Sequence, residues 1–413
     1  MKITMICFVL PYPPNFGGRV DMWRRIKAFS SIGVELQLVS WFQEHPEPED
    51  MAEMQKYCQK IYLIPFKYTI FFLARRIIDL FTYPLEVTSR IVRGQEFSCL
   101  LSEVRSFGPD VIWLDGIHGG YIATKLSEKL QIPLLTRSHN IEHLYYRRLL
   151  ASTIDFKSKL QRYLSVSHLE TLEKNLLKNS VFFYDISADD LKYWQSQGFT
   201  NGRYLPPFVE FEEDTKLLSK DDVINHDTMY DIAYLGNLYV DNNVASIIWF
   251  ITQVLPIIRS KLPKIKVLIA GLNPVTKIRQ LCEAEGVYLV INPVSSGEIY
   301  KSGRVLINPV LSGSGVSIKS VEMLVYNKPI VSTTQGISGL PEEAKQYFKI
   351  AEDAQSFAHE IIESLSNPHT VNIDRSLLES LFSSQAIEGV VSDIKSIIYS
   401  GSQPSEGKEN PNI

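Results

Sequence analysis

A lysine and a glutamate close behind a glycine-rich turn are the residues best placed to do chemistry. Lys319 and Glu322 are three positions apart on a predicted helix that follows Gly313 and Gly315, so they share one helix face. Glycine lets the backbone approach a ligand closely, and free N–H groups at a helix start attract an anion. The ammonium suits a diphosphate and the carboxylate suits two ribose hydroxyls. The pattern predicts either a nucleoside-diphosphate site or a plain surface ion pair.

A second group of polar residues follows two predicted strands in the first half of the chain: Asp115, His118, His139, Asn140 and Glu142. The carboxyl ends of parallel strands meet at one edge of a sheet, so we expect these residues to line a cleft. Asp115 is either a residue that orients or deprotonates an acceptor hydroxyl or a helix N-cap. The two histidines are either ligand-binding or structural.

The elements that must position these residues alternate between strand-like and helix-like periods. Strands are predicted at 3–10, 34–38, 110–115, 132–136, 181–187, 230–235, 266–270, 287–291, 305–308 and 330–332. Helices are predicted between them, among them a stripe of apolar residues from Val20 to Phe29 and a long helix over 156–180. This alternation predicts an α/β class with two doubly wound, Rossmann-like parallel sheets that face one another across a cleft.

An acidic, weakly apolar stretch interrupts the alternation and suggests a domain boundary. The predicted organisation is an N-terminal acceptor-side domain at 1–210, a linker at 211–228, a nucleotide-sugar domain at 229–383, a helix at 384–400 that returns to the first domain, and a disordered tail at 401–413.

Composition limits the function classes. With 413 residues and a net charge of −4, the chain suits two large domains and lacks the basic excess of a nucleic-acid-binding protein. The scattered Cys7, Cys58, Cys99 and Cys282 indicate free thiols in a reducing compartment, so we expect a cytoplasmic protein. No stretch is expected to reach the roughly 18 apolar residues that a bilayer span needs, and the best candidate, 68–74, is cut short by two arginines.

The segment 60–93 combines basic and aromatic residues. Six lysines and arginines oppose only Asp79 and Glu86, among large apolar and aromatic side chains that include Phe66, Tyr68, Ile70, Phe71, Phe72, Phe81 and Tyr83. Such a segment either lies on an anionic membrane surface, at its cytoplasmic face, or forms a helix pair on the N-terminal sheet with a solvated basic face.

Several motifs in order resemble the family 4 glycosyltransferases, retaining enzymes of GT-B fold related to the group 1 glycosyl transferases of polysaccharide biosynthesis. They cover roughly residues 1–400 and read Pro11–Gly18, Leu235–Asn237, Ile269–Gly271, Asn308–Pro309, Gly313–Gly315, Lys319, Glu322, Lys328–Thr333 and Gln335–Leu340.

The resemblance implies a metal-independent, cofactor-free transfer of a sugar from a nucleotide-diphosphate sugar to a hydroxyl acceptor: a glycan, a lipid-linked molecule or a small molecule. Donor-binding residues would be Gly17, Gly18, Gly236, Asn237, Gly313, Ser314, Gly315, Val316, Lys319 and Glu322. Catalytic residues would be Asp115, His118, His139 and Lys319, with Asn140 and Glu142 at the acceptor.

The chain departs from the family pattern in its charged residues. Ser314 stands where many members carry a first glutamate, and Ser317 stands where a basic residue often precedes the lysine. Asparagines replace the arginine and lysine frequent after the first strand of the second domain. Lys319 is then the main cation for the diphosphate, with Arg19 or Arg304 as candidate helpers.

Two other functions remain open at this point. One is a non-catalytic GT-B protein that binds a sugar nucleotide or a glycan, which the missing basic residues suggest. The other is a sugar-nucleotide epimerase on the same fold, although no set of acid–base carboxylates for it is found in the sequence.

Overall fold

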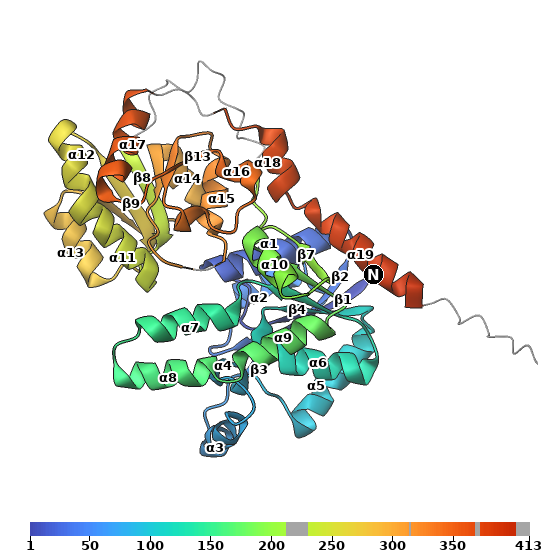
Figure 1. The fold of residues 1–413 in the computed structure, drawn as a ribbon. Helices are drawn as coiled ribbons and strands as arrows, with labels where there is room; N and C mark the ends of the chain where they lie inside the picture. The colour runs from blue at the N-terminus through green and yellow to red at the C-terminus, as the bar shows by residue number, and fades with distance from the viewer. Residues whose placement is uncertain (212–229, 314, 368–371, 402–413) are drawn as a thin grey trace, which may run out of the picture.

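The computed structural model describes residues 1–211, 230–313, 315–367 and 372–401. The predicted linker at 211–228 and tail at 401–413 therefore lie almost wholly outside the described residues. Figure 1 shows two α/β layers, one above the other, with the C-terminal helix α19 lying along the lower one.

The first sheet is built from the N-terminal half of the chain and all its strands are parallel. Its order is β3-β2-β1-β4-β5-β6-β7. The strands are β1 (Lys2–Cys7), β2 (Glu35–Phe42), β3 (Lys60–Pro65), β4 (Val111–Asp115), β5 (Leu134–Ser138), β6 (Phe182–Asp185) and β7 (Gly202–Tyr204). The near-continuous apolar sequences of β1 and β4 reflect burial of both sheet faces.

Helices cover both faces of this sheet. They are α1 (Gly17–Ser31), α2 (Pro48–Gln55), α3 (Ile70–Asp79), α4 (Leu85–Thr88), α5 (Gly94–Phe107), α6 (Gly120–Leu130), α7 (Glu142–Ser152), α8 (Phe156–Val166), α9 (Leu169–Asn179) and α10 (Ala188–Ser196). Side chains alternate along β1, so Met5 packs with α1 on one face and Ile6 packs with α5 and α6 on the other. The first domain thus has two cores, one on each side of the sheet.

The second sheet is also fully parallel, with the order β10-β9-β8-β11-β12-β13. Its strands are β8 (Tyr230–Asn237), β9 (Val267–Leu272), β10 (Tyr288–Ile291), β11 (Gly303–Asn308), β12 (Ile330–Ser332) and β13 (Phe348–Ile350). Its helices are α11 (Asp241–Trp249), α12 (Leu255–Lys261), α13 (Thr276–Ala284), α14 (Ser296–Ser302), α15 (Ile318–Leu324), α16 (Glu342–Lys345), α17 (Ala354–Ser366), α18 (Arg375–Phe382) and α19 (Ala386–Gly401).

The strand order reverses between β1 and β4 in the first sheet and between β8 and β11 in the second. In open parallel sheets, ligands bind beyond the carboxyl ends of the strands at such points. The ends of these four strands, with the loops and helices that follow them, carry most of the residues predicted from the sequence to form the site. The two Rossmann-like sheets predicted from the alternation are confirmed.

Two local expectations were wrong. Residues 60–65, expected within a membrane-surface segment or a helix pair, form the edge strand β3. The single helix expected over 156–180 is two helices, α8 and α9, because the chain turns at His168, where φ is 61°. Isolated histidines adopt this left-handed conformation more readily than most residues, and periodicity does not reveal it.

The expectation that no segment is long and apolar enough to cross a bilayer was also wrong. Among the described residues, one helical segment, Asp241–Lys261, meets both criteria. It consists of α11, one π-helical stretch and α12. Six of its apolar side chains are fully buried in the core of the second domain: Ile247, Phe250, Ile251, Val254, Leu255 and Ile258. Length and composition alone do not separate such a core helix from a membrane span.

Helix α19 closes one core of the first domain, although it follows the second domain in sequence (Figure 1). Ile387, Val390 and Ile394 are buried against the β1 side of the first sheet. The Tyr184 hydroxyl at the end of β6 donates to Asp393 Oδ2 over 2.9 Å. The chain therefore crosses between the domains twice.

Substitution Ile394→Ala should lower the free energy of unfolding by about 2–5 kcal/mol, because it leaves a cavity beneath α19. Chemical denaturation measures the change. The neighbouring exposed variant Lys395→Ala should leave stability within about 0.5 kcal/mol of the native value. Equal stability of the two variants would show that α19 does not support the first domain.

Candidate functional site

Two adjoining cavities lie between the domains, at the carboxyl ends of both sheets. The larger has a volume of about 780 Å³ and the smaller about 220 Å³. Gly17 from α1 and Ile318 from α15 line both of them. The cavities therefore form one branched site to which each domain contributes one wall.

Lys319 from α15 lines the larger cavity, together with Gly17, Gly236 and Asn237. Its Nζ donates to Tyr234 Oη over 3.0 Å and to Asn243 Oδ1 over 2.9 Å. Burial lowers the pKa of Lys319 to about 7. An ammonium held by two neutral acceptors keeps its charge available for an anionic ligand.

Glu322 lies one turn further along α15 and faces the same cavity. Its Oε1 accepts from Arg24 Nη2 of the first domain over 2.7 Å, and its Oε2 accepts from the Tyr300 hydroxyl over 3.3 Å. The spacing of Lys319 and Glu322 thus places both in one cavity, whereas the partner Arg24 lies 298 positions away in sequence.

The glycine-rich turn packs closely against the first domain. At Gly315 φ is +66°, and a Cβ there would lie 2.4 Å from Asn140 Oδ1 of the first domain. Only glycine satisfies both conditions. Val316 lines the smaller cavity, Gly313 lies near Asn242 beside the larger one, and Ser314 lies outside the described residues.

Neither arginine expected to assist Lys319 does so. Arg304 lies at the start of β11, at the opposite end of the strand, where it pairs with Asp231 over 3.1 Å. Arg19 turns back on its own loop and covers the Phe16 ring, with 5.1 Å between the guanidinium carbon and the ring centre. The basic residues that do line the larger cavity from the first domain are Arg24 and Lys27.

The smaller cavity contains most of the residues predicted on the acceptor side. Its walls include Gly18, His118, His139, Asn140 and Glu142. Asp115, predicted to act on an acceptor hydroxyl, is absent from this wall and fully buried behind it. The strand-end position was right for Asp115, but both its carboxylate oxygens point into the protein, so we assign it a positioning role.

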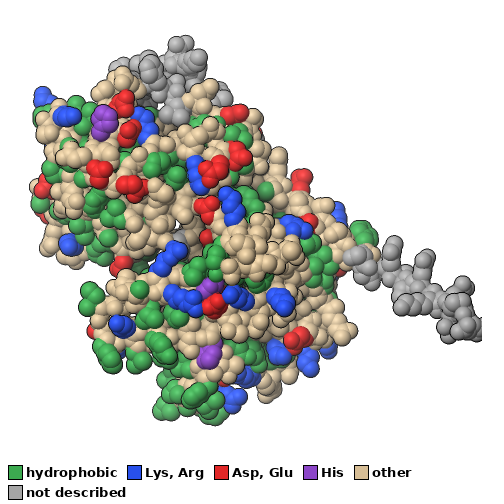
Figure 2. Space-filling view, in the orientation of Figure 1, with side chains coloured by type: hydrophobic (Ala, Val, Ile, Leu, Met, Phe, Trp, Pro, Cys, Tyr) green, Lys and Arg blue, Asp and Glu red, His purple; other side chains and the backbone are tan. Residues whose placement is uncertain are grey.

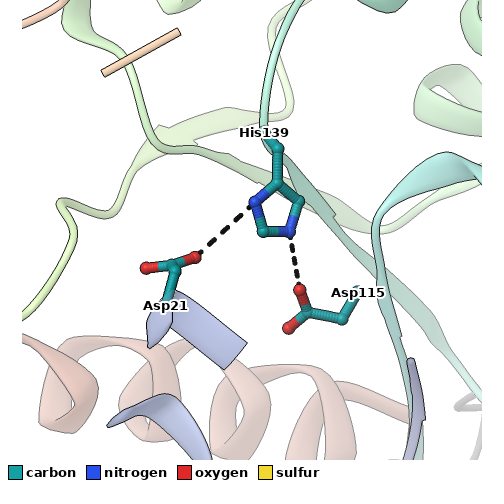
Figure 3. A group of neighbouring side chains, drawn as sticks. All are labelled: Asp21, Asp115 and His139. Atoms are coloured by element: carbon teal, nitrogen blue, oxygen red, sulfur yellow. Dashed lines mark hydrogen bonds and ion pairs between the residues drawn. The ribbon is translucent and has the colours of Figure 1, made fainter. Parts of the chain in front are cut away.

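A buried charge network holds Asp115 and His139 (Figure 3). His139 Nε2 lies 2.7 Å from Asp115 Oδ1, and its Nδ1 lies 3.8 Å from Asp21 Oδ2. Arg25 Nε donates to Asp115 over 2.9 Å, and Arg25 Nη2 donates to Asp21 over 2.6 Å. Arg137 also donates to Asp21, over 3.2 Å. Helix α1 thereby fixes the imidazole at the end of β5.

Both carboxylates of this network are ionised. Burial raises the pKa of each, but Arg25 and His139 lower the pKa of Asp115 well below its usual value, and Arg137 and Arg25 lower that of Asp21. Because ionised Asp115 can only accept, the hydrogen bond runs from His139 Nε2 to Asp115 Oδ1.

Asp21, Asp115 and His139 also have the donor types and spacing of a metal site, since their ligand atoms lie within 4.8 Å of one another. However, Arg25 and Arg137 already balance the two negative charges in the same space. A divalent cation would have to displace or adjoin two guanidinium groups, so the donor set does not fit a resident metal.

Two ionisable residues that line the smaller cavity are neutral at pH 7. Burial, with Arg90 and His139 adding to it, lowers the pKa of His118 to about 3. Burial, with Glu173 adding to it, raises the pKa of Glu142 to about 8, so this carboxyl carries a proton. His118 Nδ1 is buried and has no hydrogen-bond partner within the described parts of the chain. The smaller cavity therefore offers hydrogen bonds from groups without net charge.

Comparison with known proteins agrees with this architecture. Residues 230–367 match the family model "Glycosyl transferases group 1". The structure resembles that of Anabaena Alr3699/HepE in complex with UDP, with a TM-score of 0.63 and 11% identity over 96% of this chain and 100% of that one. It also resembles sucrose-phosphate synthase from Thermosynechococcus elongatus, with a TM-score of 0.65 and 14% identity over 97% and 100%.

The fold is GT-B. The expected resemblance to the group 1 glycosyl transferases is confirmed over residues 230–367, which span most of the second domain. A curated protein of Klebsiella pneumoniae, described as an uncharacterized 44.6 kDa protein in the cps region, is 24% identical over 380 residues, which cover 89% of this chain and 91% of that protein.

Sequence reasoning missed several residues of this GT-B site, namely Asp21, Arg24, Arg25, Arg137, Tyr234, Asn243 and Tyr300. Most of them belong to the site through hydrogen bonds to residues far away in sequence, which local spacing does not reveal. One local signal was present: Asp21 and Arg25 form an i,i+4 pair among the apolar positions of α1. Charged residues are seldom buried unless they are paired, so two opposite charges at core positions of a helix indicate a buried ion pair that helps to build a site.

The raised pKa of Glu142 makes stability depend on pH. Because the folded protein keeps a proton at Glu142 up to about pH 8 while the unfolded chain loses it near its ordinary value of 4.5, native stability should fall as pH rises between these values. Glu142→Gln cannot titrate, so its stability relative to the native protein should rise from pH 5 to pH 8, by roughly 1–3 kcal/mol.

Denaturation at the two pH values tests this. Glu103→Gln, at an exposed position on α5, serves as the control and should follow the native profile. A constant difference between Glu142→Gln and the native protein would refute the burial of a protonated carboxyl.

Proposed function

We propose that this protein is a retaining glycosyltransferase that moves a sugar from a nucleotide-diphosphate sugar to a hydroxyl acceptor. The observation that carries the proposal is the placement of Lys319 and Glu322 on one wall of the interdomain cavity. The family match over the same domain and the UDP named for the similar HepE structure support it.

Each part of the donor meets a different set of side chains in the two cavities. Lys319 neutralises the departing diphosphate beside the Gly315 turn, and Glu322 accepts hydrogen bonds from the ribose. The sugar extends into the smaller cavity, where the polar side chains of His118, His139 and Glu142 surround it. The acceptor hydroxyl approaches on the same face as the leaving group, as retention requires, and positioning supplies most of the catalysis.

We propose that this reaction needs no metal. Each carboxylate that lines the two cavities among the described residues is already neutralised: Glu322 by Arg24, Glu210 by Lys27, and Glu142 by its own proton. The charge of the diphosphate is therefore met by protein cations. Polysaccharide biosynthesis is the proposed setting, on the strength of the Klebsiella relative's cps region.

The first test concerns Lys319. Lys319→Met should weaken the binding of UDP by about 10- to 100-fold, which corresponds to the loss of one charged hydrogen bond of about 1.5–3 kcal/mol. Isothermal titration calorimetry measures the effect, with the exposed Lys277→Met on α13 as the control. Equal affinities of the native protein and Lys319→Met for UDP would show that Lys319 does not bind the diphosphate.

The lowered pKa of Lys319 predicts that the affinity for UDP depends on pH. Its pKa is about 7 in the ligand-free protein, and a bound diphosphate raises it. Binding above pH 7 should then take up a proton, so the affinity of the native protein for UDP should fall from pH 7 to pH 9. Lys319→Met should lose this slope.

We also propose that the first domain contacts the cytoplasmic face of a membrane, so that the acceptor is lipid-linked. The support is a set of exposed large apolar side chains on and beside α3 and α8, over which green side chains gather in Figure 2: Tyr68, Ile70, Phe71, Leu73, Ile77, Ile78, Phe81, Ile154, Phe156, Leu160 and Tyr163. Arg75, Lys157, Lys159 and Arg162 on the same helices have no ion pair among the described residues. Apolar anchors with cations suit an anionic lipid surface.

The double variant Phe71→Ser/Ile77→Ser tests this contact. Both side chains are more than 60% exposed, at 82% and 64%, so stability should not change. Sedimentation with vesicles of 70% phosphatidylcholine and 30% phosphatidylglycerol should fall at least several-fold, because each apolar anchor contributes buried area. Tyr288→Ser/Ile291→Ser on the second domain is the control. Unchanged sedimentation of the α3 variant would show that this face does not bind the membrane.

A further inference from the structure

We propose that Arg24 is a positioning residue of the nucleotide site, supplied by the first domain to orient Glu322 of the second domain toward the ribose. The inference rests on the proposed function, in which Glu322 binds the ribose. It adds that ribose recognition requires both domains, because the carboxylate that accepts the hydroxyls is held from across the cleft.

The geometry fixes Arg24 from two sides. Its Nη2 donates to Glu322 Oε1 over 2.7 Å, and its Nη1 donates to the carbonyl oxygen of Phe208 over 2.9 Å. Phe208 is buried in the core of the first domain, just before the chain crosses to the second. The side chains of Arg24 and Glu322 are only 16% and 17% exposed. The guanidinium is thus anchored to one domain and presented to the other.

Glu322 keeps room for a ligand after these bonds are made. An ionised carboxylate has about four acceptor positions on its two oxygens. Arg24 uses one position on Oε1, and the Tyr300 hydroxyl uses one on Oε2. Counting only partners in the described parts of the chain, one position remains on each oxygen, and Glu322 lines the larger cavity. Two neighbouring acceptor positions match the two neighbouring hydroxyls of a ribose.

A ribose should add to the Arg24 bond rather than replace it. The hydroxyls are neutral, and a hydrogen bond between two charged groups is roughly twice as strong as one between neutral groups. Displacement would also leave a guanidinium unpaired in a mostly buried place. Arg24 therefore stays on Glu322 in the bound state and holds the plane of its carboxylate. Nucleotide binding and the interdomain contact then strengthen each other.

The test isolates the ribose hydroxyls. For each variant, calorimetry gives the dissociation constants of UDP and of 2′,3′-dideoxyuridine 5′-diphosphate, and their ratio reports what the hydroxyls contribute. The native protein should prefer UDP by 10-fold or more. Arg24→Met should reduce this preference at least fivefold, and Arg24→Lys, which keeps the charge without the two-sided anchor, should retain part of it.

Lys27→Met is the matched control. Lys27 lies one turn further along α1, lines the same cavity and pairs with Glu210 rather than with Glu322. It should leave the preference for UDP unchanged. The ratio compares two ligands on one protein, so a general loss of stability in Arg24→Met does not move it.

The outcomes separate this inference from the proposed function. A native protein that binds UDP no better than the dideoxy analogue contradicts the role of Glu322, and the inference fails with it. A native preference that Arg24→Met retains in full overturns the inference alone. Tighter UDP binding by Arg24→Met overturns it as well, because Arg24 would then compete with the ribose.

Discussion

The buried pairing of Arg25 with Asp21 and Asp115 is the interaction on which the rest of the site depends. It joins α1 to the end of β4, and through Arg137 and His139 to the end of β5. These are the strands at and beside the reversal of strand order, where a parallel sheet opens to ligands. Because all five side chains are wholly or mostly buried, each charge requires its partner, and loss of one leaves an uncompensated charge at a cost of about 3–5 kcal/mol.

Helix α1 serves both domains because its polar residues point in different directions. Asp21 and Arg25, one turn apart, face the first sheet and fix His139. Arg24, next to Arg25 in sequence, projects about 100° from it around the helix and reaches Glu322. The amino end of the same helix, at Gly17, lines both cavities. One helix thus positions both the His139 imidazole beside the smaller cavity and the Glu322 carboxylate beside the larger one.

The sequence predicted what depends on local spacing. The strand–helix alternation indicated both parallel sheets, and Lys319 with Glu322 share a face because they are three residues apart. The local spacing could not predict which polar side chains are buried away from the cavities.

Asp115 follows its strand as expected, but its burial depends on Arg25, which is 90 positions away. Arg24 escaped notice for the same reason. β3 was missed because an edge strand that is only partly buried lacks the continuous apolar pattern of β1.

The contrast between the two cavities follows from what each must hold. Around the larger one, full charges occur in pairs or against neutral acceptors, so a polyanion gains from Lys319 without meeting an unbalanced carboxylate. Around the smaller one, desolvation removes the charges of His118 and Glu142. Neutral donors and acceptors suit hydroxyl-rich ligands, since they form hydrogen bonds without the desolvation cost of an ion. In the proposed reaction, charge is thereby concentrated beside the leaving diphosphate, and the sugar is held by groups without net charge.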